Sequence, residues 1–486
     1  MDHIIETING FVWSPALVVL CLVAALYFSF GTRFVQVRRF REMFRLLFAK
    51  DKSRKEGISS FQAFALALSG RVGTGNIVGV ATAIGYGGPG AIVWMWIIAF
   101  FGAGTAFAES TLAQIFKESH NGQYRGGPAY YIEKGLNCKW LAVVFALCAV
   151  IAAGLFLPPV QSNGIALSFA DTFHVEAWWV GLAVALLIGL VIIGGVKRIA
   201  NVAKIVAPIM AVIYVILSII VLICNASVVP SVFVDMIRSA FGMNEAIGGI
   251  LGSTIAWGVK RGIYSNEAGQ GTGAIVAAAA KVSHPVKQGM VQAFSVYIDT
   301  LLVCTATAAM ILATKTYNVF GPNGEILVAA QGVAVTDPGV TYTSAALGTL
   351  LGAKWGGAVI SIALFFFAFT TIMAYYYYAE TNLVYLFGKG RKEKLLIWVL
   401  RFCLIGAVFF GSLKEAKIIW DLGDIGVGAM AWINIISILL LSRVAFKALR
   451  SYEKQKKEGK EPVFNPKELN IKNADFWEEY ENNKNE

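Results

Sequence analysis

The 486-residue chain has little charge and few of the residues that usually carry catalytic chemistry. Only 15% of its residues are charged, against 57% that are hydrophobic, and this balance excludes an ordinary water-soluble domain. The four histidines are scattered, and no HExxH, GxSxG or closely spaced cysteine pair accompanies them. The six cysteines lie mostly in separate apolar runs, where packing roles are expected. We therefore expect neither an enzyme nor an organic cofactor.

The net charge of +11 does not indicate a nucleic-acid partner, because the basic residues gather in loops beside apolar runs. Lysine and arginine concentrated in alternate loops mark the cytoplasmic side of a membrane protein. With eleven apolar runs, these loops predict an outside amino terminus and a cytoplasmic carboxyl terminus. The loop residues counted are Arg33, Arg38, Arg39, Arg41, Arg45, Lys50, Lys52, Arg54, Lys55, Lys197, Arg198, Lys204, Lys260, Arg261, Lys389, Arg391, Lys392 and Lys394.

Long apolar runs identify an all-α polytopic membrane protein surrounded by lipid. At roughly 20 apolar residues per span, the chain contains about eleven transmembrane helices. The first run is long enough to span and has acidic residues before it, so no cleavable signal is expected. The seventh run is short and glycine-rich. The expected spans are Ser14–Gly31, Phe61–Ile84, Gly90–Phe116, Trp140–Ala170, Ala177–Gly195, Ala203–Cys224, Ala246–Val259, Met290–Thr314, Trp355–Phe387, Leu395–Leu413 and Ile418–Leu441.

Spans two to six and seven to eleven form two groups of five, and an odd number of spans gives the groups opposite orientations. Each group opens with a glycine-interrupted span, which is typical of the central site of a transporter built from inverted repeats. We divide the chain into an extra amino-terminal span with a basic loop (1–58), a first repeat (59–225), a second repeat (226–442) and a charged cytoplasmic tail (443–486). The tail from Tyr452 onward is poor in aliphatic residues and is expected to be solvated or disordered.

The most informative stretch interrupts the second apolar run with glycines, a hydroxyl, an amide and a cation, in the sequence Ser69-Gly-Arg-Val-Gly-Thr-Gly-Asn76. Non-helical backbone is tolerated at membrane depth only where protein or a water-filled cavity shields it. The freed N–H groups of Gly73, Thr74, Gly75 and Asn76 suit a carboxylate, and the Thr and Asn side chains add polar contacts. Close helix packing would also explain the glycines, but not the adjacent polar residues. We therefore predict a substrate site here.

Other polar residues in the apolar runs are weaker candidates. Gln161 follows a proline pair that breaks helix hydrogen bonding, and it could bind substrate or bond across helices. Ser253 and Trp257, on the seventh span, could contact a small substrate, although Trp257 could also lie at the membrane interface. Arg71 is expected to pair with an intramembrane acid, either Glu109 or Glu380. For Glu109 we expect a structural pairing rather than a role in ion coupling. Asp299 is the third notable acid.

Three longer motifs resemble the alanine/glycine:cation symporter family of prokaryotes. They are ALSGRVGTGNIVGVATAIGYGGPGAIVWMW, GVKRGIYSNEAGQGTGA at Gly258–Ala274, and SHPVKQGMVQAFSVYIDTLLVCTATA at Ser283–Ala308. The resemblance covers nearly all of the chain. It implies the leucine-transporter fold, with a 5+5 inverted repeat, two discontinuous helices and one extra amino-terminal helix. It also implies a multi-pass protein of a prokaryotic cell membrane that couples the uptake of alanine or glycine to sodium.

The resemblance further implies where sodium binds. Carbonyl groups at the start of the unwound segment, those of Ser69 and Val72, would face the ion, and span nine would supply the Phe367 carbonyl with the hydroxyls of Thr370 and Thr371. Taken alone, these threonines could equally bond back to their own helix.

Two alternatives and one further motif stay open. The first alternative is a proton relay through the buried acids, which would replace sodium coupling. The second is a channel, which would also use broken helices, although a channel usually presents a ring of similar groups from several subunits. The loop Arg261–Gly273 carries Ser265, Asn266 and Glu267, which could cap a short helix. We expect this loop to be a structured cytoplasmic turn.

Overall fold

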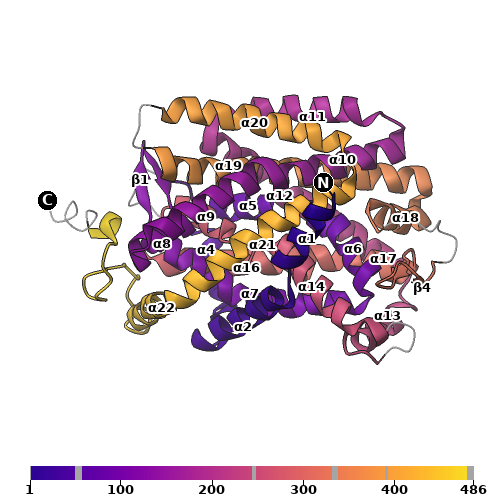
Figure 1. Cartoon of the computed structure of the whole chain (residues 1–486). Coiled ribbons are helices and arrows are strands. Elements are labelled where there is room, and N and C mark those ends of the chain that lie inside the picture. The colour runs from indigo at the N-terminus through magenta and orange to yellow at the C-terminus, as the bar shows by residue number, and fades with distance from the viewer. Residues whose placement is uncertain (1, 50–56, 244–247, 331–337, 389–391, 479–486) are drawn as a thin grey trace.

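The computed structural model describes residues 2–49, 57–243, 248–330, 338–388 and 392–478. Most of them are helical, and the long helices run side by side across the molecule (Figure 1). The α-helices are α1 (Asp2–Val12), α2 (Pro15–Gly31), α3 (Val35–Arg38), α4 (Phe40–Leu47), α5 (Ser60–Arg71), α6 (Val80–Gly87), α7 (Gly90–Ile115), α8 (Pro128–Leu136), α9 (Lys139–Ile151), α10 (Leu157–Phe173), α11 (Ala177–Ile192), α12 (Gly195–Cys224), α13 (Val229–Ala240), α14 (Leu251–Asn266), α15 (Thr272–Ala279), α16 (Pro285–Val296), α17 (Thr305–Thr314), α18 (Val340–Leu351), α19 (Ala353–Phe387), α20 (Glu393–Leu413), α21 (Ala416–Leu440) and α22 (Ser442–Lys457).

Short irregular elements lie inside or between these helices. Three are π-helical, η1 (Gly75–Gly79), η2 (Ala152–Phe156) and η4 (Tyr297–Cys304), and η3 (Gly248–Ile250) is a 3₁₀ turn. Strands β1 (Glu118–His120) and β2 (Gln123–Arg125) form one antiparallel hairpin, and β3 (Val319–Phe320) pairs with β4 (Ile326–Val328) in another. The hairpin β1–β2 lies at the same end of the molecule as α22, while α13, α18 and β4 lie at the opposite end (Figure 1).

Within the described residues, eight helices are long and apolar enough to cross a membrane, and the pair α5 and η1–α6, bent by 53°, makes a ninth candidate. The apolar helix α11 and the broken segment α14–α15 account for the other expected spans, so the expected eleven is consistent with this arrangement. Six basic residues counted for the orientation, four after helix α4 and two after span nine, lie outside the described residues: Lys50, Lys52, Arg54, Lys55, Lys389 and Arg391.

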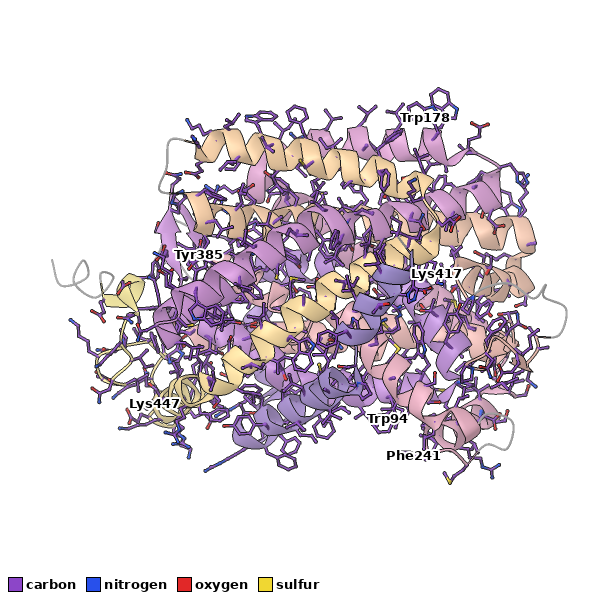
Figure 2. All side chains as sticks on the ribbon, viewed as in Figure 1. Trp94, Trp178, Phe241, Tyr385, Lys417 and Lys447 are labelled. Atoms are coloured by element: carbon purple, nitrogen blue, oxygen red, sulfur yellow. The ribbon has the colours of Figure 1, made fainter. Side chains whose placement is uncertain are left out.

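Large apolar side chains are exposed on the outer helices. Leu190 of α11, Ile223 of α12 and Phe402 of α20 are all more than 60% exposed, and Trp178 projects from the outer edge of α11 (Figure 2). The inner helices are different, because α5 is buried along almost its whole length, polar residues included. Apolar faces outside and polar groups inside are what a lipid environment requires.

The seventh span differs from its predicted form. Helix α14 does not end near Val259 but continues to Asn266, and α15 follows after a break at Glu267–Gly271. The predicted cytoplasmic turn is therefore wrong, because Glu267 is 1% exposed and its neighbours in the loop are buried too. Lys260 and Arg261 lie inside α14 and pair with Asp424, so they do not belong among the loop cations that indicate orientation.

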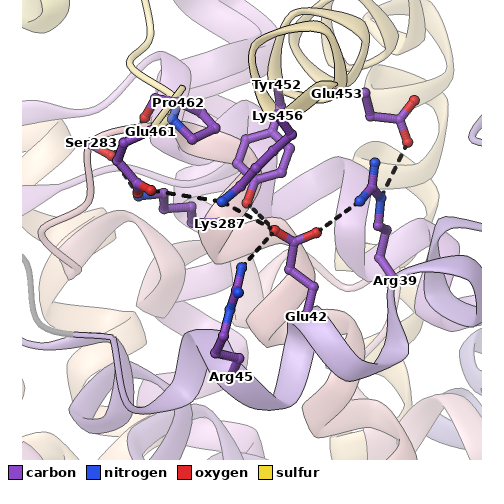
Figure 3. Close-up of polar contacts among 10 residues, drawn as sticks. All are labelled: Arg39, Glu42, Arg45, Ser283, Lys287, Tyr452, Glu453, Lys456, Glu461 and Pro462. Carbon is purple, nitrogen blue, oxygen red and sulfur yellow. Dashed lines mark hydrogen bonds and ion pairs between the residues drawn. The ribbon is translucent and has the colours of Figure 1, made fainter. Parts of the chain in front are cut away.

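The carboxyl-terminal tail is also more ordered than predicted, at least to residue 478. Its first part is α22, where Tyr452 contacts Glu42 of α4 and Glu453 contacts Arg39, the residue before α4, in the ion network of Figure 3. Further along, Glu461 pairs with Lys287, and the fully buried Trp477 donates its indole N–H to the Gln114 carbonyl oxygen at 2.9 Å. The prediction of a disordered tail considered only its low content of aliphatic residues. Aromatic residues of the tail pack it against the end of α7.

This packing makes a stability prediction. Replacing Trp477 by Ala leaves a cavity at the end of α7 and should lower the free energy of unfolding by about 3–5 kcal/mol. Thermal unfolding of the purified protein in detergent measures the change. Trp140→Ala is the matched control because Trp140 is 69% exposed, and it should have little effect. Equal losses in the two variants would show that the tail does not support the fold.

Candidate functional site

The first helix break lies between α5 and η1. Ser59 caps α5 with a capping box to Gln62, and the helix runs to Arg71, after which Val72 turns to an extended conformation. A π-helical turn begins only three residues later, at Gly75. The predicted unwound segment Gly73–Asn76 is therefore shifted: the true interruption is centred on Val72 and Gly73, and Asn76 lies within the π-helical turn.

Gly73 is required by close approach rather than by an unusual backbone angle, since it is not among the residues with positive φ. A Cβ atom at this position would lie 2.5 Å from the Thr371 hydroxyl oxygen and 2.7 Å from the Gln161 amide oxygen. That amide oxygen accepts a hydrogen bond from the backbone N–H of Thr74 at 3.0 Å. The structure thus places Gln161 and Thr371, two of the predicted site residues, directly on the break.

The Asn76 side chain connects two elements. Its Oδ1 accepts from the Gly73 backbone N–H at 2.8 Å, and its Nδ2 donates to Asp299 Oδ1 at 2.7 Å. The first bond satisfies a backbone donor that the break leaves free. The second ties η1 to the buried turn η4. Asn76 therefore holds the shape of the break.

Carbonyl oxygens converge on a single hydroxyl beside the break. Thr371 Oγ1 lies 2.8 Å from Ser69 O, 3.2 Å from Val72 O and 2.9 Å from Phe367 O. One hydroxyl can donate only one hydrogen, so the cluster holds more acceptors than it can satisfy internally. Thr370 is different: its hydroxyl bonds back to the Phe366 and Phe367 carbonyls of its own helix, as threonines in membrane helices commonly do.

The second break faces the first. Gly269 and Gly271 adopt positive φ angles of 91° and 86°, so the chain leaves α14 through left-handed residues that favour glycine. The end of α14 lies against η1, because a Cβ at Gly75 would lie 3.2 Å from the Tyr264 ring and 3.3 Å from Ser265. The signal that could have found this break was the short apolar run that follows it, which is too short to span alone.

Asp299 lies between the two breaks and is fully buried. Its carboxylate accepts hydrogen bonds from Asn76, from Ser265 at 3.0 Å and from Thr300 at 2.7 Å. No basic side chain within the described ranges lies within ion-pair distance of it. A buried carboxylate with hydrogen bonds but no cation is a natural place for a positively charged part of a ligand.

An ion pair covers one side of this region. Arg261 of α14 makes two hydrogen bonds of 3.0 Å to the two Asp424 oxygens of α21. Its guanidinium also stacks on the Trp420 ring, 4.6 Å from the centroid. A Cβ at Gly79 would lie 3.7 Å from the Arg261 side chain, so this pair lies over η1. On the far side, a β-bridge joins Ile58 to Ala280, linking the start of α5 with the end of α15.

Among the described residues, Arg71 forms an ion pair with neither of its predicted partners, Glu109 and Glu380. Glu380 pairs with Arg125 at 2.6 Å, and the Glu109 carboxylate accepts from Asn434 at 2.9 Å. Arg71 instead donates through Nη1 to Ser295 and Gln292 of α16.

The structure does not bring Ser253 and Trp257 to the breaks. The Ser253 hydroxyl donates to the Tyr86 carbonyl oxygen at 2.8 Å, and the Trp257 ring stacks on the Tyr86 ring with centroids 5.0 Å apart. Both lie against the end of α6. A contact between either residue and the substrate stays a prediction.

Comparison with known proteins decides the family. A profile described as the sodium:alanine symporter family matches residues 1–466. The chain belongs to this family. A putative sodium/proton-dependent alanine carrier, YrbD of Bacillus subtilis, is 54% identical over 98% of both chains. The sodium/proton-dependent alanine carrier of Bacillus sp. PS3 is 48% identical, over 88% of this chain and 95% of that protein. GlnT of B. subtilis, a probable sodium/glutamine symporter, is 42% identical over 96% of this chain and 93% of that protein.

Two solved structures share the fold of this symporter at 14% sequence identity and a TM-score of 0.50 each. One is MhsT in complex with L-phenylalanine, matched over 81% of this chain and all of that chain. The other is a sodium-coupled sialic acid symporter, matched over 93% of this chain and 92% of that chain. The predicted family, the helical transporter fold and the assignment as a carrier rather than an enzyme are confirmed.

The hydrogen bonds of Asn76 make a binding prediction. Asn76→Ala removes the acceptor of the Gly73 N–H and one donor to Asp299, so it should abolish alanine binding while the protein stays folded in detergent. Equilibrium binding of radiolabelled alanine measures the effect. Asn163→Ala is the matched control, because Asn163 is a buried asparagine that bonds to the Gly411 and Lys414 carbonyls instead. Unchanged alanine affinity in Asn76→Ala would contradict the site.

Proposed function

We propose that the chain is a secondary transporter that moves alanine, and also glycine, into the cell together with sodium. The observation that carries the proposal is the meeting of two helix breaks at Asn76, Asp299 and Ser265, with a surplus of carbonyl oxygens around Thr371 beside them. The family and the alanine carriers among its relatives support the choice of substrate and ion.

The substrate would bind between the breaks. Backbone N–H groups of Gly73, Thr74, Gly75 and Asn76 suit the carboxylate, and the Gln161 amide, now bonded to Thr74, would exchange that bond for one to the substrate. Asp299 would balance the ammonium group. The close contact of Gly75 with Tyr264 and Ser265 leaves little room for a side chain, which favours alanine and glycine over larger amino acids.

Sodium would bind at the carbonyl cluster. A hard cation requires several oxygen ligands, and Ser69 O, Val72 O, Phe367 O and the Thr371 hydroxyl already converge. Thr370 is adjacent and contacts the Phe367 carbonyl, so it would complete the set after a rotamer change. An ion there would link α5 to α19, joining the two predicted repeats.

Alternating access would use the closures on either side of the breaks. Separation of Arg261 from Asp424 would open one side, and separation of the Ile58–Ala280 bridge would open the other. The other described cations counted for orientation, including Arg45 of the short helix α4 and Lys197 in the first turn of α12, support a cytoplasmic location for the second closure and for α22. With this orientation the amino terminus would lie outside, and we propose that the two repeats are 59–225 and 226–442.

Two relatives are described as sodium/proton-dependent carriers, and this makes proton coupling a second candidate for this chain. The specific observation in its favour is a group of buried acids around one arginine, Arg71. The proton would add to sodium coupling or replace it.

Uptake into proteoliposomes tests the function. Radiolabelled alanine should accumulate against its gradient when an inward sodium gradient is imposed, and glycine should compete. A pH gradient in sodium-free buffer shows whether protons alone drive uptake. Passive equilibration of alanine without accumulation would indicate a channel, and no flux under any gradient would reject transport of alanine.

The carbonyl cluster makes a separate prediction for sodium. Thr371→Val removes the hydroxyl at the centre of the cluster and should raise the sodium concentration for half-maximal uptake by about tenfold or more, because a buried polar ligand costs 1–3 kcal/mol when lost. Thr370→Val should have a smaller effect. Thr349→Val is the control, since Thr349 bonds only locally to Ala346 in α18. An unaltered sodium dependence in Thr371→Val would move the cation site elsewhere.

A further inference from the structure

The interior of the bundle carries more negative than positive charge near the breaks. Glu109, Glu267 and Asp299 are each at most 1% exposed. The positive charge of Arg71 attracts all three carboxylates. If every group were ionised, the cluster would carry two uncompensated negative charges in an apolar region. Uncompensated charge at this depth is costly, so the cluster must take up positive charge from outside. A ligand beside Asp299 supplies only one such charge.

Only one nitrogen of the Arg71 guanidinium donates hydrogen bonds to described residues. Its Nη1 donates to Ser295 and Gln292, whereas its Nη2 and Nε have no hydrogen-bond partner among the described residues. A Cβ at Gly273 would lie 2.5 Å from Arg71 Nη2 and 3.8 Å from Glu109 Oε1. The unused side of the guanidinium and the Glu109 carboxylate therefore face the same point, which a side chain at 273 would fill.

The two oxygens of Glu109 have different surroundings. Oε2 accepts from Asn434 Nδ2, and Asn434 is fixed by bonds to the Tyr131 hydroxyl and to the Gly269 carbonyl oxygen. Asn434 can therefore only donate to Glu109. Oε1 has no hydrogen-bond partner within the described chain, although the residue is fully buried. One oxygen is held permanently as an acceptor and the other is free to carry a hydrogen.

Glu267 has the same pattern and reaches α5 through Tyr378, whose hydroxyl lies where a Cβ atom at Gly70, the neighbour of Arg71, would be. Its Oε2 accepts from the Tyr378 hydroxyl at 3.1 Å, and its Oε1 has no partner in the described part of the chain. The titratable and charged groups that face this pair are Arg71 from α5, Tyr131 from α8, Tyr264 from α14, Tyr375 and Tyr378 from α19, and Asp299 from η4. The uncharged polar groups beside it are Asn434, the Gly271 backbone N–H and the Thr272 hydroxyl. Arg71 is the only cation in this set. Two carboxylates that share one guanidinium favour a state in which one of them is protonated.

We propose that Glu109 and Glu267 together bind one proton opposite Arg71, and that this pair is the proton-coupling site of the transporter. The inference rests on the proposed function, because it assumes that alanine is the cargo. The proton comes from water on the side from which the cargo enters, forms an O–H bond at a free Oε1, and returns to water on the other side. No oxidant, reductant or other reactant is required.

The position of the cluster explains how the proton acts on cargo binding. Arg71 ends α5 directly before the first break, and Glu267 begins the second break. Protonation removes one of the two negative charges that attract the free side of Arg71. The guanidinium then holds the ends of both breaks in one arrangement, in which Asp299 is left as the single uncompensated acid for the cargo.

Equilibrium binding of radiolabelled alanine to the full-length protein, at saturating sodium and over a series of pH values, tests the proposal. A site that binds cargo and one proton together loses affinity as the pH rises, by up to about tenfold per pH unit. Glu109→Gln and Glu267→Gln each fix the cluster in the charge state of the protonated pair. Both variants should bind alanine with the affinity that the unmodified protein has at low pH, and this affinity should not change with pH.

Glu380→Gln is the matched control, because Glu380 is a buried acid that has its own cation, Arg125, and it should keep the original pH dependence. A pH-sensitive dye inside proteoliposomes with equal sodium concentrations on both sides should also report proton entry on addition of alanine, and this signal should disappear in Glu109→Gln. Retention of the original pH slope in both glutamine variants overturns the proposal. So does pH-independent binding by the unmodified protein. Failure of the unmodified protein to bind alanine at any pH would instead reject the proposed cargo.

Discussion

Two interrupted helices meeting inside an apolar bundle impose the constraint on which the rest of the structure depends. Each interruption frees backbone donors and acceptors that neither lipid nor bulk water can satisfy. Side chains satisfy part of this requirement: Asn76 accepts from the Gly73 N–H, Gln161 accepts from the Thr74 N–H, and the Thr371 hydroxyl lies within hydrogen-bond distance of the Ser69 and Val72 carbonyls. These residues come from different helices, so the same bonds that repair the breaks also hold the bundle together.

This arrangement explains why the site is polar but small. Glycine at 73 and 75 allows side chains of neighbouring helices to approach the backbone directly, and the space gained is taken up by Thr371, Gln161 and Tyr264. The groups that would bind a ligand are thus the groups that now bind one another. A ligand must exchange with existing hydrogen bonds, and a small zwitterion can do this with the least displacement of its surroundings.

The sequence predicted the first break and its partners on α19 because glycine, hydroxyl and amide residues interrupt an otherwise apolar run. It also predicted a second interrupted helix, but it placed the interruption in the glycine-rich seventh run, because the buried residues of Arg261–Gly273 are as polar as those of an ordinary loop. Arg261 and Glu267 look solvated in the sequence, and they are buried because partners on α21 and α19 meet them in space. Pairings of this kind, like that of Glu380 with Arg125, depend on tertiary distance and leave no local signal.

The contact of Trp477 with Gln114 joins residues separated by 363 positions in the chain. During synthesis the Gln114 carbonyl at the end of α7 therefore stays uncovered until residue 477 has been made. A copy that lacks Trp477 cannot close this seam, however well its helices have inserted. Copies cut short before this residue thus differ in structure from copies that contain it, and proteolysis can act on that difference.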